Sequence, residues 1–212
     1  MRWVLREKGE VYDAEPVSLP LDGMPPDFPS VMLTSLDSRH RIDIARTRVN
    51  VYRTRTAEDS PLDFRSVAGS LGRLVAELAE QSQVPIGRLA IVGHSSAVAE
   101  EPGKEVARHF FRERWLQGAL NSPEHLEIHT RKMFPLANGL KVNSWVRVRT
   151  AERLVGPTPI VWIEQDINSL EEERPELDFS RSEVFDFFDH AISEFSTILN
   201  LYFPPEPALK EV

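Results

Sequence analysis

One serine lies in a segment that is close to an enzyme active-site motif. The hydrophobic run 89–92 leads into Gly93-His94-Ser95-Ser96-Ala97, which approaches the G-x-S-x-G turn that presents the nucleophile in serine hydrolases. Ser95, Asp166 and His190 also follow one another in the order of nucleophile, acid and base in the α/β-hydrolase fold. A serine hydrolase-like enzyme that uses Ser95 is therefore one interpretation of the sequence.

Three features of the surrounding sequence argue against that chemistry. Ala97 stands where the motif has the glycine that lets strand and helix approach closely. His190 lies inside an amphipathic helical pattern, whereas the base of such enzymes normally lies on a loop. Residues 126–166 read as three consecutive strands without crossover helices, so they do not predict the parallel sheet that builds the turn. We therefore predict a structural role for Ser95 and no catalytic residue.

Metal and nucleotide sites have little support in the residue spacing. His125 and His129 fall on one face of a strand pattern, but no third ligand is near them in the sequence. The acidic residues between Glu164 and Glu173 lack the glycine and the spaced oxygen ligands of a calcium loop. Neither G-x-x-x-x-G-K-[ST] nor G-x-G-x-x-G is present. We expect no metal site and no cofactor.

A surface that mixes arginine with tryptophan is the clearer functional signal. In the strand pattern 140–149, apolar or small residues at even positions alternate with polar, basic and aromatic residues at odd positions. The pattern 159–166 leaves the side of Trp162 ambiguous, and Arg41 points away from the apolar residues of an earlier strand. Arginine with tryptophan is typical of interaction hot spots. The candidate binding residues are Lys141, Trp145, Arg147, Arg149 and Arg41.

The elements that must position these residues follow in a repeated order. The predicted strands are 31–36, 41–45, 48–53, 89–95, 126–134, 140–149 and 159–166, and the predicted helices are 64–83, 104–119 and 181–202. Asn138-Gly139 predicts a hairpin turn. The order predicts an α+β fold: a mainly antiparallel sheet from two similar βββα halves that share one sheet, with long helices on one face.

The helical periodicity also predicts a core. Leu71 and Leu78 recur at helical spacing in the first long helix, and Phe187, Phe188 and Phe195 do so in the last one, so we expect all five to be buried. Ser180 or Ser182 is the expected N-cap of the last helix. Along the chain we predict an extended proline-rich lead-in over 1–30, a single α+β domain over 31–204 and a tail over 205–212.

Composition narrows the function classes. The 212-residue chain has no cysteine and a formal net charge of −8, so nothing is held by disulfides and nucleic acid is an unlikely partner. The N-terminus lacks the apolar core of a signal peptide and no later segment is apolar enough to span a bilayer. These features favour a bacterial-type cytoplasmic protein without a membrane partner.

Two longer segments carry a resemblance. PSVMLTSLDSRHRIDIARTRVNVYRTR with the following helix and IGRLAIVGHS, and later WIEQDINSL with FFDHAISEFSTILNLYFP, resemble a sporadically distributed family of uncharacterised bacterial cytoplasmic proteins over residues 29–203. The strand 89–95 is less basic here than in many members. The resemblance carries over no activity, cofactor or catalytic residue. The alternation of antiparallel strands with two long helices is also loosely similar to SecB-type chaperones, by fold alone.

The sequence thus favours a protein that acts by binding. We expect a non-catalytic binding or oligomerising protein that uses the exposed Arg/Trp sheet face, as a homo-oligomer or with a protein partner such as an acidic peptide. The alternatives are the Ser95 enzyme, and a SecB-like chaperone or a toxin–antitoxin or defence-associated binding module.

Overall fold

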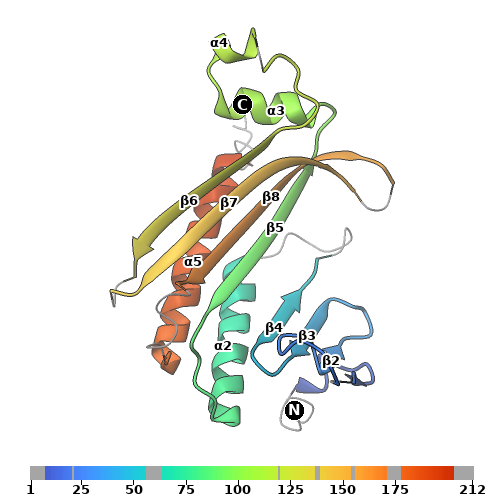
Figure 1. Cartoon of the computed structure of the whole chain (residues 1–212), viewed down its shortest axis with the longest axis vertical. Coiled ribbons are helices and arrows are strands. Elements are labelled where there is room, and N and C mark those ends of the chain that lie inside the picture. The colour runs from blue at the N-terminus through green and yellow to red at the C-terminus, as the bar shows by residue number, and fades with distance from the viewer. Residues whose placement is uncertain are drawn as a thin grey trace, which may run out of the picture. The chain divides into compact units, whose positions relative to one another are not determined.

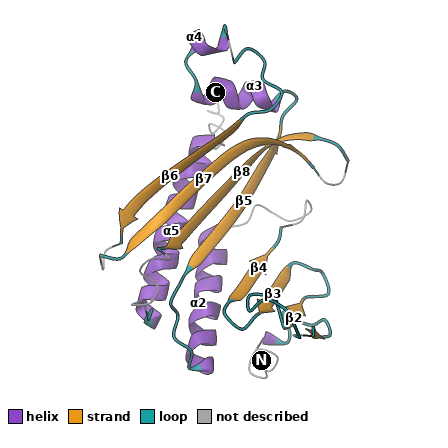
Figure 2. Ribbon diagram, viewed as in Figure 1, coloured by secondary structure: helices purple, strands orange, loops and turns teal. Residues whose placement is uncertain are grey.

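The computed structural model describes residues 8–20, 22–55, 64–118, 120–136, 139–153, 156–170 and 178–202. The chain divides into two compact units, Met1–Val84 and Pro85–Val212, and each unit is described by itself. The single domain expected over 31–204 stays a prediction. Figures 1 and 2 show the ribbon with its helices and strands.

The first unit is a four-stranded antiparallel sheet in the order β1-β2-β3-β4. Its elements are β1 (Val17–Ser18), β2 (Val31–Thr34), β3 (His40–Ile44), β4 (Val49–Arg53) and the helix α2 (Phe64–Ser82). Tyr12, Leu33, Ile42 and Leu74 form its buried apolar cluster. The helix α2 contributes Leu74 to that cluster, so it packs on the sheet of its own unit.

The second unit is a larger antiparallel sheet in the order β5-β8-β7-β6. Its elements are β5 (Ala90–Val98), α3 (Pro102–Phe110), α4 (Glu113–Leu116), β6 (Glu127–Pro135), β7 (Lys141–Glu152), β8 (Pro159–Ser169) and α5 (Arg181–Tyr202). In Figure 1 α5 runs behind this sheet, and within the unit no described helix lies in front of it. One sheet face is therefore packed against α5, and the other is not covered by a helix of this unit.

The α+β class and the antiparallel pairing are confirmed, but the expectation of one shared sheet is wrong, because the strands form two sheets. Alternation tells which face of a strand is buried and not which strand lies beside it. β5 pairs along its whole length with β8 and belongs to the second sheet only. The β6–β7 hairpin forms, with Gly139 at φ +84; Asn138 lies outside the described residues.

The helix predicted over 104–119 is wrong in its second half. α3 ends at Phe110, because Phe111 has the extended backbone angles φ −114 and ψ 147. A short helix follows at Glu113–Leu116, and Ala119 lies outside the described residues. The strand predicted to end at 95 continues to Val98, so the polar residues 93–97 lie within a strand and not in a turn.

The core of α5 matches its periodicity. Phe187, Phe188 and Phe195 are buried, whereas Leu71 and Leu78 of α2 are only partly buried, which corrects their expected burial. Ser180 caps α5 by a capping box. The Glu183 amide approaches the Ser180 Oγ at 3.4 Å, and the Ser180 amide and hydroxyl donate to the Glu183 carboxylate at 2.9 and 2.6 Å. The local sequence therefore determines where α5 begins.

Candidate binding face

The two faces of the second sheet separate cleanly. The packed face holds Val146, Val148, Val161 and Ile163, which form one buried cluster with Val106 of α3 and receive Ile198 of α5. Gly93 of β5 also lies on this side, where a Cβ atom would collide with the Phe195 ring. These contacts identify the side of the sheet that α5 occupies.

The other side, here called the open face, is defined by residues that alternate with the packed ones. Register places them in rows across the strands, because antiparallel partners project to the same side. The three central rows are Val92, Asp166, Trp145 and Arg131; His94, Glu164, Arg147 and His129; and Ser96, Trp162, Arg149 and Glu127. Lys141 and Asn143 precede Trp145 on the same side of β7.

A hydrogen-bonded chain joins Arg131 and Asp166 of the first row through Asn143 and Asn168, the cross-strand pair next to it. Arg131 donates from Nε and Nη2 to the Asn143 Oδ1 at 2.9 and 2.6 Å, and its guanidinium carbon lies 5.3 Å from the centre of the Trp145 ring. Asn143 donates to Asn168 at 3.3 Å, and Asn168 donates to Asp166 at 2.9 Å. The Asp166 carboxylate thus accepts a hydrogen bond from the Asn168 amide. The Arg131 guanidinium lies over the Trp145 ring and forms no ion pair with a carboxylate of the described residues.

The second row is built around Glu164. Arg147 Nη1 forms an ion pair with one Glu164 oxygen, and His94 Nε2 lies 3.4 Å from the other. The His94 ring lies 5.0 Å from the Trp162 ring, centre to centre. Arg147 is therefore charge-compensated within the face.

The third row contains Arg149, a cation without an ion pair among the described residues. His129 Nε2 lies 2.8 Å from a Glu127 carboxylate oxygen, and this hydrogen bond lowers the pKa of Glu127. Arg149 adds a weaker lowering effect on that pKa but forms no hydrogen bond or ion pair with a described residue. Trp162 Nε1 is buried and has no acceptor among the described residues. The face consequently presents Arg149, Arg131 and Lys141 as cations that form no ion pair with a carboxylate of the described chain.

The structure brings most of the predicted binding residues together. Lys141, Trp145, Arg147 and Arg149 share the open face, and their role in binding stays a prediction. Arg41 belongs to the other sheet, in the first unit. There its guanidinium forms two hydrogen bonds, at 2.7 and 2.8 Å, with Asp43, whose carboxylate is buried. The single Arg/Trp surface expected to include Arg41 is thus divided between two sheets.

The sequence left several members of the face unassigned. Trp162 was ambiguous, and its pairing with Arg149 and Ser96 places it on the open face. Arg131 and His129 are the odd-numbered residues of β6, and their places follow once β6 is paired with β7. These placements were not predictable, because the residue pattern of a single strand does not give its register with the neighbouring strand.

The residues of the hydrolase interpretation are held apart. Ser95 lies in the middle of β5 opposite Ile163, on the packed side, and no described histidine forms a hydrogen bond with it. The His190 ring lies 4.7 Å from the ring of Phe134 on β6, and its Nε2 is buried without a described partner. β5 and β6 are opposite edges of the sheet, so about 14 Å separates these strands at ~4.8 Å per step. Asp166 projects to the other face.

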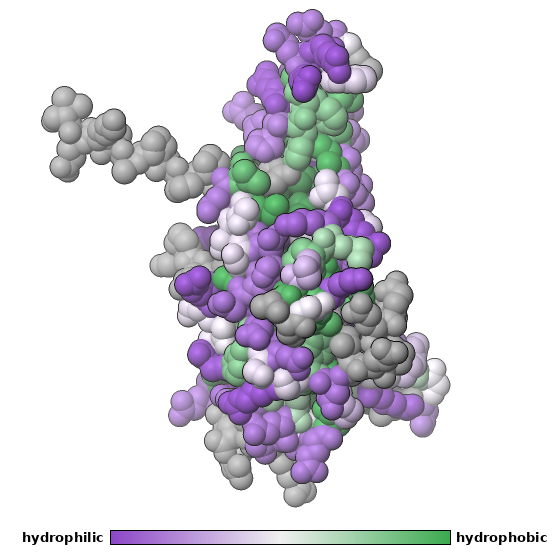
Figure 3. Space-filling view, turned by 90° about the vertical axis from the view of Figure 1, so that its left-hand side faces the viewer, coloured by the Kyte–Doolittle hydropathy of each residue, from purple (hydrophilic) through white to green (hydrophobic). Residues whose placement is uncertain are grey.

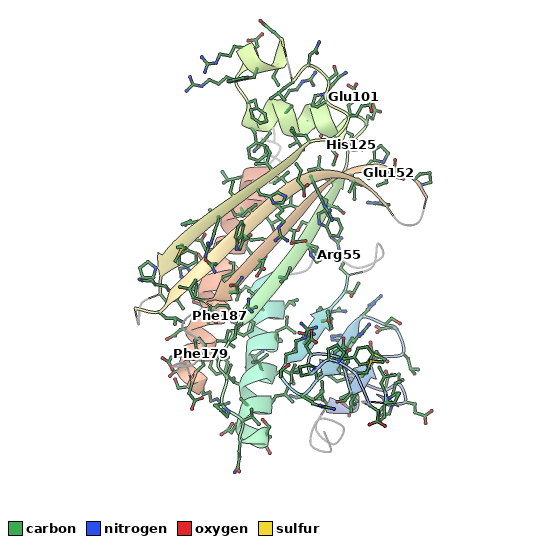
Figure 4. All side chains as sticks on the ribbon, in the orientation of Figure 1. Arg55, Glu101, His125, Glu152, Phe179 and Phe187 are labelled. Atoms are coloured by element: carbon green, nitrogen blue, oxygen red, sulfur yellow. The ribbon has the colours of Figure 1, made fainter. Side chains whose placement is uncertain are left out.

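The residues considered above as possible metal ligands do not form a cluster in the described chain. His125 precedes β6 at the end nearest α3 (Figure 4), and both it and His129 are exposed. No group of three potential ligands occurs among the described residues. Glu171, Glu172 and Glu173 lie outside them.

The end of this unit that carries α3 and α4 has a different surface. Hydrophilic residues dominate this end in Figure 3, where it is at the top. Arg108, Arg112 and Arg114 are exposed there beside the exposed ring of Trp115. These arginines offer matched controls for the open face, because they lie in the same unit but outside the sheet.

Comparison of the chain with models of known protein families and with curated proteins gives no match. In the described part of the chain, no helix is long and apolar enough to cross a membrane.

Proposed function

We propose that this chain is a non-catalytic binding protein, and that its open face takes an acidic segment of a protein partner. The observation that carries the proposal is a charge imbalance. Each carboxylate of the face is already held by a neighbour, whereas Arg131, Arg149 and Lys141 form no ion pair with a carboxylate among the described residues. A ligand that supplies carboxylates would complete the face.

The side chains beside these cations favour a peptide as the source of the carboxylates. A guanidinium is planar and binds a carboxylate through two parallel hydrogen bonds, so Arg149 and Arg131 suit this recognition better than lysine would. Trp145 and Trp162 lie next to them on the same face. Both indoles are already partly buried, so a ligand would remove only their remaining exposed surface from water. A peptide supplies both carboxylates and apolar side chains.

The charge distribution disfavours nucleic acid as the ligand. Glu127, Glu164 and Asp166 are interspersed among the cations, and they would repel the evenly spaced phosphates of a nucleic acid backbone. The net charge of −8 adds a long-range repulsion. A peptide can place its carboxylates at irregular intervals, which fits this mixed pattern.

Binding of a short acidic peptide that contains one aromatic residue tests the proposal on the full chain. Tryptophan fluorescence should change on titration, and Arg149→Gln should weaken binding about tenfold, since a charge-assisted hydrogen bond is worth ~1.5–3 kcal/mol. Arg112→Gln is the matched control, because it removes the same charge from the α4 end. It should leave the affinity within about twofold.

Three outcomes would contradict the proposal. The acidic peptide fails to bind, or Arg149→Gln and Arg112→Gln weaken it equally, which indicates an attraction without a site. In the third, a single-stranded oligonucleotide binds through the same residues and the acidic peptide does not, which makes the face a nucleic-acid site.

A further inference from the structure

The two edges of the second sheet, β5 and β6, offer their free backbone groups differently. In the β5–β8 ladder the Ser169 amide donates to the Leu89 carbonyl at 2.9 Å, and the Ala99 amide donates to the Pro159 carbonyl at 3.2 Å. The odd-numbered residues of β5 thus bond to β8, and the even-numbered ones turn their N–H and C=O groups outward. These outward residues are Ala90, Val92, His94, Ser96 and Val98.

The β6 edge is protected against pairing with another strand. The Leu136 amide donates to the Leu140 carbonyl and the Thr150 amide donates to the Leu126 carbonyl, so even-numbered residues face β7 and odd-numbered residues face outward. Pro135 is one of the outward residues and has no N–H to offer. Glu127 and Arg131 add charges at outward positions. Proline and charge are the usual devices that block edge pairing.

The β5 edge has neither device. The strand AIVGHSSAV contains no proline and no aspartate, glutamate, lysine or arginine over its 9 residues. Val92 and Val98 are 50% and 57% exposed. A long uncharged edge with exposed apolar side chains is a template for another strand.

We propose that β5 pairs with β5 of a second copy of this chain, antiparallel and about a two-fold axis at His94. The five outward residues are symmetric about His94. The axis would pair Ala90 with the partner's Val98, Val92 with the partner's Ser96, and His94 with the partner's His94. Every outward N–H and C=O of the strand would then have a partner.

The symmetry of the strand favours a copy of itself over a foreign peptide. A two-fold axis makes one surface serve both partners, so the strand must be its own complement. No aspartate, glutamate, lysine or arginine meets a like charge in this register, because β5 has none, and its one histidine, His94, meets the partner's His94. The axis is perpendicular to the sheet, so both open faces lie on one side of an eight-stranded sheet. The pairing uses the strand edge and does not depend on the proposed ligand of the open face.

The absence of cysteine allows a sharp test of the axis. Residues opposite each other in a hydrogen-bonded antiparallel pair have Cα atoms about 5.5 Å apart, which a disulfide can span. His94→Cys would place the only thiol of the full chain at the axis. Ser96→Cys would place it four residues from its own copy along the strand, about 14 Å away at ~3.4 Å per residue. Under mild oxidation, His94→Cys should form a covalent dimer at least about tenfold faster than Ser96→Cys.

A second measurement uses proline at matched positions of the two edges. Val92 and Met133 are both 50% exposed and both turn their N–H outward. In sedimentation velocity from about 1 to 100 µM, the range in which a micromolar dimer dissociates, the native chain should show a dimer. Met133→Pro should keep it and Val92→Pro should lose it. Circular dichroism checks that each variant is folded, and Val92→Lys replaces Val92→Pro if the latter unfolds.

Several results would overturn the pairing. One is a native chain that stays monomeric throughout that range. Another is equal cross-linking of His94→Cys and Ser96→Cys, or none in either. A dimer that is lost in Met133→Pro and kept in Val92→Pro assigns the interface to the β6 edge.

Discussion

The two faces of the second sheet consist of the same four strands and carry opposite kinds of side chain. On the packed face, Val148 and Ile163 are 1% and 2% exposed. On the open face, the residues beside them in sequence are Arg147, Arg149, Trp162 and Glu164. Alternate positions of one strand thus supply the apolar core on one side and a charged, aromatic surface on the other. Substitutions on the packed face should therefore lower the free energy of unfolding, and substitutions on the open face should affect ligand binding.

The largest expected effect comes from the packed side. Phe187 is 1% exposed (Figure 4), so Phe187→Ala should lower the free energy of unfolding by about 3–5 kcal/mol through lost burial and a cavity. Arg149→Ala on the open face should change it by less than about 0.5 kcal/mol. Urea denaturation measures both. Equal losses in the two variants would contradict the division between the faces.

Gly93 sharpens the comparison within a single strand. A Cβ atom at Gly93 would overlap the ring of Phe195, which is 2% exposed and has little room to move. Gly93→Ala should therefore cost about 1–3 kcal/mol. Ser96→Ala on the opposite face of β5 is the control and should stay within about 0.5 kcal/mol. An unchanged melting temperature in the Gly93→Ala variant would mean that Phe195 of α5 does not pack closely against Gly93.

The Arg147–Glu164 pair should contribute little to stability. The two side chains are 40% and 21% exposed, so solvent screens the pair, and a coupling free energy of about 0.2–1 kcal/mol is expected. A double-mutant cycle with Arg147→Ala and Glu164→Ala measures it. A coupling above about 3 kcal/mol would show that this part of the open face behaves like a buried core.

The smallest effect concerns the titration of Glu127. The hydrogen bond from His129 holds the pKa of this carboxyl below its ordinary value of 4.5. The sign follows from linkage: the folded state gains stability above the unfolded pKa, and this gain disappears as the pH falls through the lowered pKa. Carboxyl NMR titration of the native chain and of His129→Gln measures the shift. A pKa at or above 4.5 in the native chain would contradict the contact.

Periodicity was sufficient for the last helix and for the two faces of β7. The helix over Arg181–Tyr202 and its buried phenylalanines followed from 3.6-residue spacing. The placement of Trp145, Arg147 and Arg149 on one side followed from strict alternation with Val146 and Val148.

Those patterns did not predict which strands pair. β5 reads as a short apolar strand in either sheet, and only its ladder with β8 assigns it to the second. For the same reason Arg41 was grouped with Trp145, although its strand pairs only with β2 and β4. The break of α3 at Phe111 was also missed, because Lys104–Leu116 contains neither glycine nor proline. Tertiary contacts, and not local propensity, set these features.

The indole N–H resonances of the full chain test the central claim most directly. The chain has 4 tryptophans, and Trp145 and Trp162 belong to the open face, whereas Trp115 lies on α4. Titration with the acidic peptide, followed in ¹H–¹⁵N spectra assigned with single Trp→Phe variants, should shift the Trp145 and Trp162 resonances and leave Trp115 unchanged. Binding that shifts Trp115 alone, or that leaves both open-face indoles unmoved, would contradict the assignment of the open face as the binding surface.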